Sequence, residues 1–294
     1  MLPVITFILL STVSYFIIMD IDTPVPFIAQ SDSEEKEVVH FGVISRYSPR
    51  SIISGYEPLM KYLSDNTPYT FKLKLSRSYM ETVNQLIEGS VDFASLGNYT
   101  YINAHRNHGV RCIAMPINKM GNLKNYDDII VKEESPAHSL DDLKGHSFAF
   151  ASKQSFSSWM TIWMLHGANV HLSDLSEVEY HSYHDLVAEK VLRGEFDAGM
   201  VKAVVAEKYA PLGIRTLARS PAIPSVPLVA GPVVDSTRIS IVQNALLALE
   251  SLIENGEVST TGWDEEVANG FRAGHDSLFN FPRRILAELD QTTQ

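Results

Sequence analysis

The stretch SKQSFSS, from Ser152 to Ser158, places four serines within seven residues. It follows the apolar run HSFAFA and precedes the largely apolar run WMTIWMLHG, so we expect it to join a strand to a helix. Backbone N–H groups at a helix N-terminus favour an anion, and serine hydroxyls add neutral donors. The stretch predicts part of an anion-binding site, with ordinary helix capping as the alternative role.

His184 is a second candidate. It lies two residues after Ser182, the expected N-cap of a helix over 183–193. A histidine in the first turn meets the positive end of the helix dipole and should stay neutral. Packing against other residues is its alternative role. Two H-x-x-H pairs occur, at 181–184 and 105–108, but neither has a third ligand at metal spacing, so we expect no metal site.

Signatures of catalysis are missing from the sequence. It contains no Gly-rich phosphate loop, no G-x-S-x-G and no C-x-x-C. The single cysteine, Cys112, excludes an internal disulfide. We expect it to be a small buried residue on a strand, with a nucleophilic or metal-binding role as the alternative. The sequence therefore predicts a protein that is not an enzyme and needs no cofactor.

A repeat indicates how these residues are positioned. The stretches at 78–105 and 182–209 share Ser-Tyr, an amphipathic run, a glycine and an aspartate that begins a short strand. Strands and helices alternate along the rest of the chain as well, which is typical of mostly parallel α/β sheets. Two similar α/β units predict two lobes with a ligand cleft between them. The aspartates, Asp92 and Asp197, are expected to make capping or turn hydrogen bonds.

The N-terminal segment differs from the rest of the chain. Residues 2–19 are almost wholly apolar, and no lysine or arginine precedes Lys36. The run is just long enough to span a bilayer, and the acidic stretch AQSDSEEKE that follows resembles a linker. We interpret residues 1–30 as an export signal, either cleaved or retained as a membrane anchor by residues 2–19. The 294-residue chain has a net charge of −11, which argues against nucleic-acid binding.

A family resemblance extends from about Val38 to Val234. It is carried by both copies of the repeat and by the segments FGVISRYSPRS, YEPLMKYLS, SLDDLKGHSFAFASKQSFSSW and IPSVPLVAGPVV. These resemble the phosphate-, phosphite- and phosphonate-binding periplasmic proteins of ABC transporters. The resemblance implies a type II periplasmic-binding-protein fold, whose lobes close around a small oxyanion and present it to a membrane permease. It also implies a monomer that acts in the periplasm.

The resemblance further implies which residues bind the ligand, namely Tyr47, Tyr101, Ser155, Ser157, Ser158 and His184. Two positions depart from the family pattern. Phe156 replaces a threonine of the serine-rich loop, and Lys202 lies where amine-recognising phosphonate binders have a carboxylate. A lysine that faces the cleft would favour a bare oxyanion such as phosphate, phosphite, sulfate or an arsenic oxyanion over an aminoalkyl phosphonate. Solvation at a helix start is its alternative role.

The expected lobes comprise residues 38–125 with 229–294, and residues 126–228, with hinges near 120–130 and 222–230. Two other functions stay open from the sequence. A sensor module, tethered by an uncleaved anchor, would report the oxyanion to a membrane histidine kinase, and Cys112 would then bind trivalent arsenic. An enzyme on this scaffold, such as a thiaminase-like protein, would need a nucleophile with a positioned base, and only Cys112 could serve.

Overall fold

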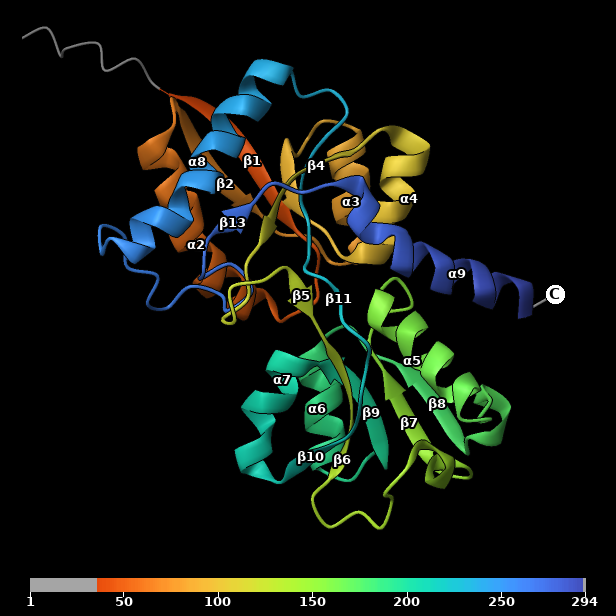
Figure 1. The fold of residues 1–294 in the computed structure, drawn as a ribbon. Helices are drawn as coiled ribbons and strands as arrows, with labels where there is room; N and C mark the ends of the chain where they lie inside the picture. Colours follow the sequence, from red (N-terminus) through yellow and green to blue (C-terminus); the bar gives the residue numbers. More distant parts are fainter. Residues whose placement is uncertain (1–35, 293–294) are drawn as a thin grey trace, which may run out of the picture. The chain divides into compact units, whose positions relative to one another are not determined.

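The computed structural model describes residues 36–292. The predicted export signal or anchor, residues 1–30, lies outside the described residues. No helix within residues 36–292 is both long and apolar enough to cross a membrane. The described chain contains two larger sheets, each with helices packed on it, which confirms the predicted α/β fold with two lobes (Figure 1).

Lobe 1 is built on a six-stranded sheet with the strand order β13-β4-β12-β3-β1-β2. β1 pairs in parallel with β2 and β3, whereas β12 is antiparallel to β3 and β4. The strands are β1 (Glu37–Val43), β2 (Tyr69–Lys74), β3 (Phe93–Ser95), β4 (Arg111–Pro116), β12 (Leu228–Ala230) and β13 (Phe271–Arg272). The helices of this lobe are α2 (Pro49–Asn66), α3 (Tyr79–Ile87), α4 (Asn98–His108) and α8 (Ser236–Glu254).

Lobe 2 is built on a five-stranded sheet with the strand order β10-β6-β9-β7-β8. β7 pairs in parallel with β8 and β9, and β6 is antiparallel to β9 and β10. The strands are β6 (Asp127–Lys132), β7 (Ser147–Phe150), β8 (Glu177–Tyr180), β9 (Ala198–Lys202) and β10 (Ile214–Arg219). The helices are α5 (Phe156–Gly167), α6 (His184–Leu192) and α7 (Ala203–Tyr209).

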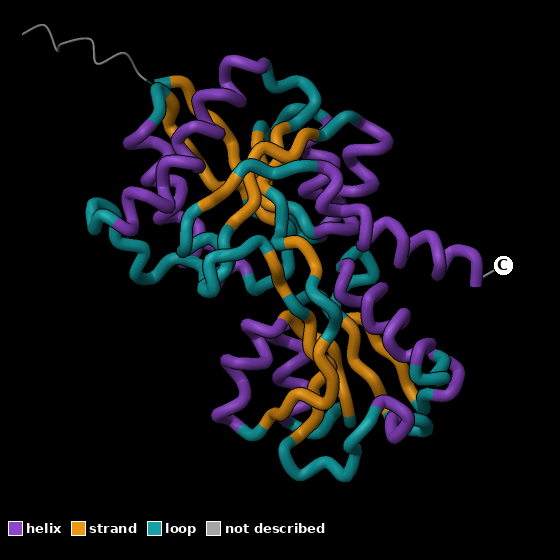
Figure 2. The backbone as a smooth tube through the Cα atoms, viewed as in Figure 1, coloured by secondary structure: helices purple, strands orange, loops and turns teal. Residues whose placement is uncertain are grey.

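The two lobes are connected by two segments that pair with each other. β5 (Lys124–Asn125) and β11 (Ile223–Pro224) form a short antiparallel ladder between the lobes (Figure 1). Around this ladder both connections consist of strand and loop (Figure 2). The C-terminal helix α9 (Asn280–Thr292) makes a further link, because its Ile285 and Leu289 pack in one apolar cluster with residues of α5.

Short 3-10 helices complete the fold. They are η1 (Leu140–Leu143), η2 (Leu172–Asp174), η3 (Ala210–Leu212) and η4 (Asp276–Phe279).

The helix α2 illustrates how the sequence specifies these elements. Ser48 is its N-cap and accepts a hydrogen bond from the backbone N–H of Ser51 at 3.2 Å. Pro49 occupies the first helical position, where no N–H is needed. The buried face repeats at helical spacing, through Ile52, Tyr56, Leu59 and Leu63. These features fix the start of α2, and with it the loop that carries Arg46 and Tyr47.

The two copies of the repeat build the same substructure in the two lobes. Gly89 and Gly194 end α3 and α6 with φ angles of 78° and 73°, a left-handed conformation that favours glycine. Asp92 then accepts a hydrogen bond from the backbone N–H of His40 in β1 at 2.8 Å. Asp197 accepts one from the backbone N–H of Ser147 in β7 at 2.9 Å. Both carboxylates therefore bind the backbone of a neighbouring strand about 50 residues away in the sequence, and not a cap or turn of their own as predicted.

Candidate functional site

Three segments that follow or precede strands meet between the lobes. They are the loop after β1, the start of α5 and the start of α6. Neither N-cap of these helices, Ser155 for α5 or Tyr183 for α6, makes a side-chain capping bond. The predicted N-cap of α6, Ser182, is thus wrong by one residue. The backbone N–H of His184 donates to the carbonyl oxygen of Arg46 at 3.2 Å, which joins the start of α6 to lobe 1.

Buried polar side chains from both lobes gather at this place. We call them the polar cluster, and its members are Arg46, Tyr47, Tyr79, Asp127, Ser155, Ser157, His184, Lys202 and Glu266. Each is less than a tenth exposed. Burying so many polar groups costs free energy unless they are hydrogen-bonded, so their contacts indicate what each one does.

Arg46 is the central cation of the cluster and is 1% exposed. Its Nε donates to Glu266 at 2.9 Å, and its Nη2 donates to Ser95 at 3.0 Å and to the hydroxyl of Tyr56. Burial alone would lower the pKa of Arg46, but Tyr56 and Glu266 outweigh this effect and raise it, so the guanidinium stays charged. Nη1 has no hydrogen-bond partner among the described residues.

Glu266 connects the lobes. It lies between α8 and β13, and its carboxylate accepts hydrogen bonds from Arg46 and from the Tyr47 hydroxyl at 3.0 Å. Lys202 of lobe 2 approaches the same carboxylate at 2.8 Å, and Asn125 of β5 at 3.4 Å. Burial acts to raise the pKa of Glu266, but Lys202 and Arg46 together lower it to about 2. The carboxylate is therefore ionised and neutralises part of the charge of both cations.

His184 is fully buried, and neither of its ring nitrogens has a hydrogen-bond partner among the described residues. The carbonyl of Met200 lies near the ring, but not in hydrogen-bond geometry. Burial, with Lys202 as the next contribution, lowers the pKa of His184 to about 3. The imidazole is therefore neutral, as the sequence predicted, and one of its nitrogens carries a proton that it can donate.

The three predicted serines have different partners. Ser155 interacts with the phenol of Tyr79, which lies at the start of α3 in lobe 1. Burial raises the pKa of this phenol well above its ordinary value, so Tyr79 stays a neutral donor. Ser157 donates to Asp127 at 2.8 Å. The hydroxyl of Ser158 donates to backbone carbonyls of its own loop at 3.1 and 3.3 Å, and so it holds the loop together.

Tyr101 and Cys112 lie in another part of lobe 1. The hydroxyl of Tyr101 donates to Asp276 at 3.1 Å, and its ring packs against Phe279 at a centroid distance of 4.4 Å. Among residues 36–292, Tyr101 shares the apolar packing of Tyr79, but no hydrogen bond joins it to a member of the polar cluster, so we do not include it in the site. The thiol of Cys112 lies 3.7 Å from the sulfur of Met115, and burial raises the pKa of this thiol to about 12.

Sequence reasoning missed four members of the cluster, namely Arg46, Tyr79, Asp127 and Glu266. Two of them carried a signal. Arg46 directly precedes Tyr47, a predicted ligand-binding residue, and Tyr79 belongs to the repeated Ser-Tyr pair. Glu266 had no such signal, because it lies 220 residues from Arg46 in the sequence and outside every recognised motif.

Cavities adjoin the cluster on several sides. One of about 270 Å³ lies between the lobes, where Tyr79 and Arg77 face Lys153 and Ser182. Another, of about 240 Å³, is lined by Tyr47 and Glu266 of lobe 1 and by residues of α6 and α7. A third, of about 460 Å³, lies beside β5 and includes Lys202 and Glu266 in its lining. Space for a small molecule therefore exists beside Tyr47, Tyr79, Lys202 and Glu266, whereas the other members of the polar cluster do not line these three cavities.

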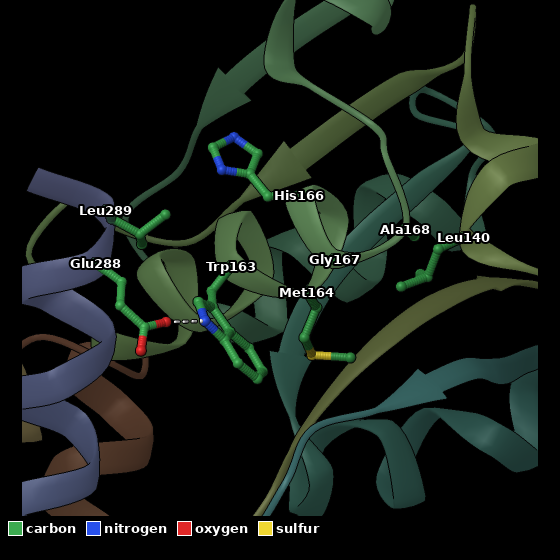
Figure 3. Close-up of a pocket in the computed structure, with 8 residues that line it drawn as sticks. All are labelled: Leu140, Trp163, Met164, His166, Gly167, Ala168, Glu288 and Leu289. Atoms are coloured by element: carbon green, nitrogen blue, oxygen red, sulfur yellow. Dashed lines mark hydrogen bonds between the residues drawn. The ribbon is translucent and has the colours of Figure 1, made fainter. Parts of the chain in front are cut away.

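A larger pocket, of about 630 Å³, lies away from the cluster, between α5 and α9 (Figure 3). Trp163 crosses it and donates its indole N–H to Glu288 at 2.8 Å. The lining offers an acidic side chain but no lysine or arginine, and burial lowers the pKa of His166. We therefore do not assign an anion-binding site to this pocket.

Comparisons with known proteins fit this geometry. Residues 41–277 match the profile of a family described as the periplasmic substrate-binding proteins of phosphonate ABC transporters. A binding protein component of an ABC phosphonate transporter from Pseudomonas aeruginosa shares 20% sequence identity and a TM-score of 0.78, with 88% of each chain covered. A Prochlorococcus marinus protein solved with methylphosphonate shares 17% identity and a TM-score of 0.75, over 87% of this chain and 99% of that one.

The structural similarity also includes a protein described as a binder of sulphonates. The periplasmic aliphatic sulphonate binding protein of Escherichia coli shares 14% identity and a TM-score of 0.62, over 87% of this chain and 93% of that one. These similarities confirm the predicted type II periplasmic-binding fold. They also indicate that the fold by itself does not decide which oxyanion is bound.

Proposed function

We propose that this chain, which belongs to the family of periplasmic substrate-binding proteins of phosphonate ABC transporters, binds a small phosphorus oxyanion in the polar cluster. The ligand would be phosphate, phosphite or a phosphonate, and the chain would deliver it to a membrane permease. One observation carries the proposal. Nη1 of Arg46 and both ring nitrogens of His184 are buried without a hydrogen-bond partner among the described residues. Because buried polar groups are normally satisfied, an oxyanion that accepts hydrogen bonds from Nη1 and from the one protonated ring nitrogen of His184 would satisfy these donors.

The cluster supplies directed donors rather than a large positive charge. Glu266 already neutralises much of the charge of Arg46 and Lys202. Nη1 of the guanidinium carries two N–H groups without a partner among the described residues, and these can make charge-assisted hydrogen bonds. The starts of α5 and α6 add partial positive charge from their dipoles. Tyr79 and Ser155 are bonded to each other, which leaves one of their two hydroxyl hydrogens to donate to a ligand. Such a site would select a compact oxyanion by hydrogen-bond geometry.

Of the residues predicted from the sequence, we keep Tyr47, Ser155, Ser157, His184 and Lys202 as proposed ligand-binding residues. The hydroxyls of Tyr47 and Ser157 already donate to Glu266 and Asp127, which belong to the polar cluster, so they would have to exchange these partners to donate to the ligand. Lys202 is buried in the polar cluster. The predicted preference for a bare oxyanion over an aminoalkyl phosphonate requires such a position, because the lysine must lie near the ligand. Its ammonium is paired with Glu266, however, so it would contact the ligand only if the ammonium bound Glu266 and the ligand at the same time. The preference against an aminoalkyl phosphonate is therefore a proposal that a titration must test.

The setting follows from the family and the chain organisation. Membership of this family implies that the protein acts in the periplasm. We propose that residues 1–30 export it, or that residues 2–19 anchor it. The lobes would divide at 125/126 and 228/229, next to the paired strands β5 and β11. Bending of these two strands would open and close the cleft.

The test is a calorimetric titration of the purified full-length chain, freed of bound ligand. The probes would be phosphate, phosphite, methylphosphonate, 2-aminoethylphosphonate and sulfate. We expect micromolar or tighter binding of at least one phosphorus oxyanion. His184→Ala should weaken it at least tenfold, which is about 1.4 kcal/mol. The matched control, His138→Ala, changes an exposed histidine and should leave the affinity unchanged. The proposal fails if no phosphorus compound binds, or if His184→Ala binds as tightly as the wild type.

A further inference from the structure

Asp127 is a buried carboxylate whose bonding is incomplete. It is the first residue of β6, pairs in register with Lys202 of β9 and is 1% exposed. Its Oδ1 accepts the hydroxyl of Ser157 at 2.8 Å, and its backbone N–H donates to Ser220 at 3.0 Å. Its Oδ2 has no hydrogen-bond partner among the described residues. A buried acceptor left without a partner destabilises the folded protein, so its retention requires a reason.

The next residue shows what a structural carboxylate looks like in the same strand. Asp128 is also fully buried, but both of its oxygens are paired. Arg219 donates to them through Nε and Nη2, at 2.7 Å in each case, and the hydroxyl of Thr216 donates at 3.1 Å. Asp128 and Asp127 lie on opposite faces of β6, because side chains alternate along a strand. The unpaired oxygen therefore belongs to the face that carries the polar cluster.

Several groups of the cluster surround Asp127. Lys202, Glu266 and Asp128 act on it electrostatically, and Tyr79 in turn feels both Asp127 and Arg46. Burial raises the pKa of Asp127 to about 6, although Lys202 opposes this. Near neutral pH the carboxylate is thus mostly ionised. An ionised acceptor inside an anion site repels any oxyanion that offers only acceptors.

We infer that Asp127 is a specificity-determining residue whose free Oδ2 accepts a hydrogen bond from a P–OH group of the ligand. The inference rests on the proposed function and narrows its substrate class to phosphorus oxyanions that still carry a proton. Phosphoryl groups lose their second proton only near neutral pH, with a pKa of about 6 for phosphate monoesters, so protonated forms are available. Sulfate and sulfonates carry no proton under these conditions. They would place an oxygen against the carboxylate with no hydrogen between them.

Two ligands isolate this hydrogen bond. Methanesulfonate and the monoanion of methylphosphonate have the same charge and nearly the same shape, but only the phosphonate carries a hydroxyl. Calorimetry on the full-length chain should give methylphosphonate an affinity at least about 100-fold higher, as is found where a buried polar group is left unpaired by the wrong ligand. Asp127→Asn replaces the free acceptor with an amide that can also donate. It should weaken methylphosphonate and strengthen methanesulfonate, so that their ratio falls at least about tenfold.

Asp128→Asn is the matched control, because it makes the same change at the neighbouring buried position and should leave the ratio unchanged. A wild-type protein that binds both ligands within threefold overturns the inference, and this measurement needs no variant to fold. An Asp127→Asn ratio equal to the wild-type ratio overturns it as well. In both cases the proposed function survives, because phosphorus oxyanions still bind. If the wild type binds no phosphorus oxyanion, both the proposed function and the inference fail.

Discussion

Replacing Glu266 with glutamine removes the charge at the centre of the contacts between the lobes. The substitution keeps the shape of the side chain and an oxygen that can accept hydrogen bonds. It leaves Arg46 and Lys202, both buried, without the carboxylate that pairs with them at 2.9 and 2.8 Å. Breaking one partner of a buried ion pair typically costs 3–5 kcal/mol, because an uncompensated charge stays behind.

The pKa of Glu266 gives the magnitude by a second route. It is lowered from 4.5 to about 2 in the folded protein, and each unit corresponds to about 1.4 kcal/mol, so the ionised carboxylate contributes about 3 kcal/mol. Because the folded pKa is depressed, this contribution is present above pH 4.5 and is lost as the pH falls toward 2. The difference between wild type and Glu266→Gln should therefore shrink by roughly 2 kcal/mol between pH 5 and pH 3.

Urea unfolding followed by tryptophan fluorescence measures both quantities. The matched control is Glu265→Gln, a change of the exposed neighbour, which should stay within about 0.5 kcal/mol of the wild type. A loss of less than about 1 kcal/mol at pH 7 in Glu266→Gln would refute the reasoning, since the network would then contribute little beyond its desolvation cost. A difference that persists undiminished at pH 3 would refute the assignment to the ionised carboxylate.

Three further sets of measurements test single groups. In wild type, His184 should lower the unfolding free energy by about 2 kcal/mol between pH 7 and pH 5. The reason is that its imidazole takes up a proton near pH 6.5 in the unfolded chain, but stays neutral in the folded protein, where its pKa is about 3. Urea titrations of His184→Gln should therefore show a fall in unfolding free energy that is smaller by this amount. Ser158→Ala and Tyr101→Phe should each lose about 1 kcal/mol of unfolding free energy, yet change the calorimetric affinity for the oxyanion less than twofold, because their hydroxyls bond to protein groups. Cys112 should react with iodoacetamide at pH 8 at least about tenfold more slowly than free cysteine, because burial raises its pKa to about 12. A pH dependence in His184→Gln that equals that of the wild type would contradict the first argument. A tenfold loss of affinity in Ser158→Ala or Tyr101→Phe would contradict the second, and alkylation of Cys112 as fast as that of free cysteine would contradict the third.

The sequence predicted the frame of the molecule well because the frame depends on local patterns. Hydrophobic periodicity and the glycine-aspartate turns recur in both copies of the repeat, and each recurs as the same helix, turn and strand. The loop residues next to strand ends could likewise be predicted, because their position follows from the order of strands and helices along the chain. His184 and Ser155 are examples, and both lie in the polar cluster.

The side chains that complete the cluster depend on contacts between distant segments, which one sequence does not reveal. Glu266 meets Arg46 only because the chain returns to lobe 1 after β11. Tyr101 shows a second limit of the sequence. Its place in a motif predicted a ligand contact, which stays a prediction, whereas nothing in the sequence indicated that its ring would pack in the apolar core of lobe 1 or that its hydroxyl would bond to Asp276.

The duplication also explains why the cluster is asymmetric. In the first copy Ser78 is the N-cap of α3, and Tyr79 is the first helical residue. In the second copy the helix begins one residue later, so the equivalent tyrosine becomes the N-cap and His184 is the first helical residue. Both first residues, a phenol from lobe 1 and an imidazole from lobe 2, are buried in the polar cluster. A shift of one residue in where the helix starts therefore lets two similar lobes bring different side chains, a phenol and an imidazole, into one polar cluster.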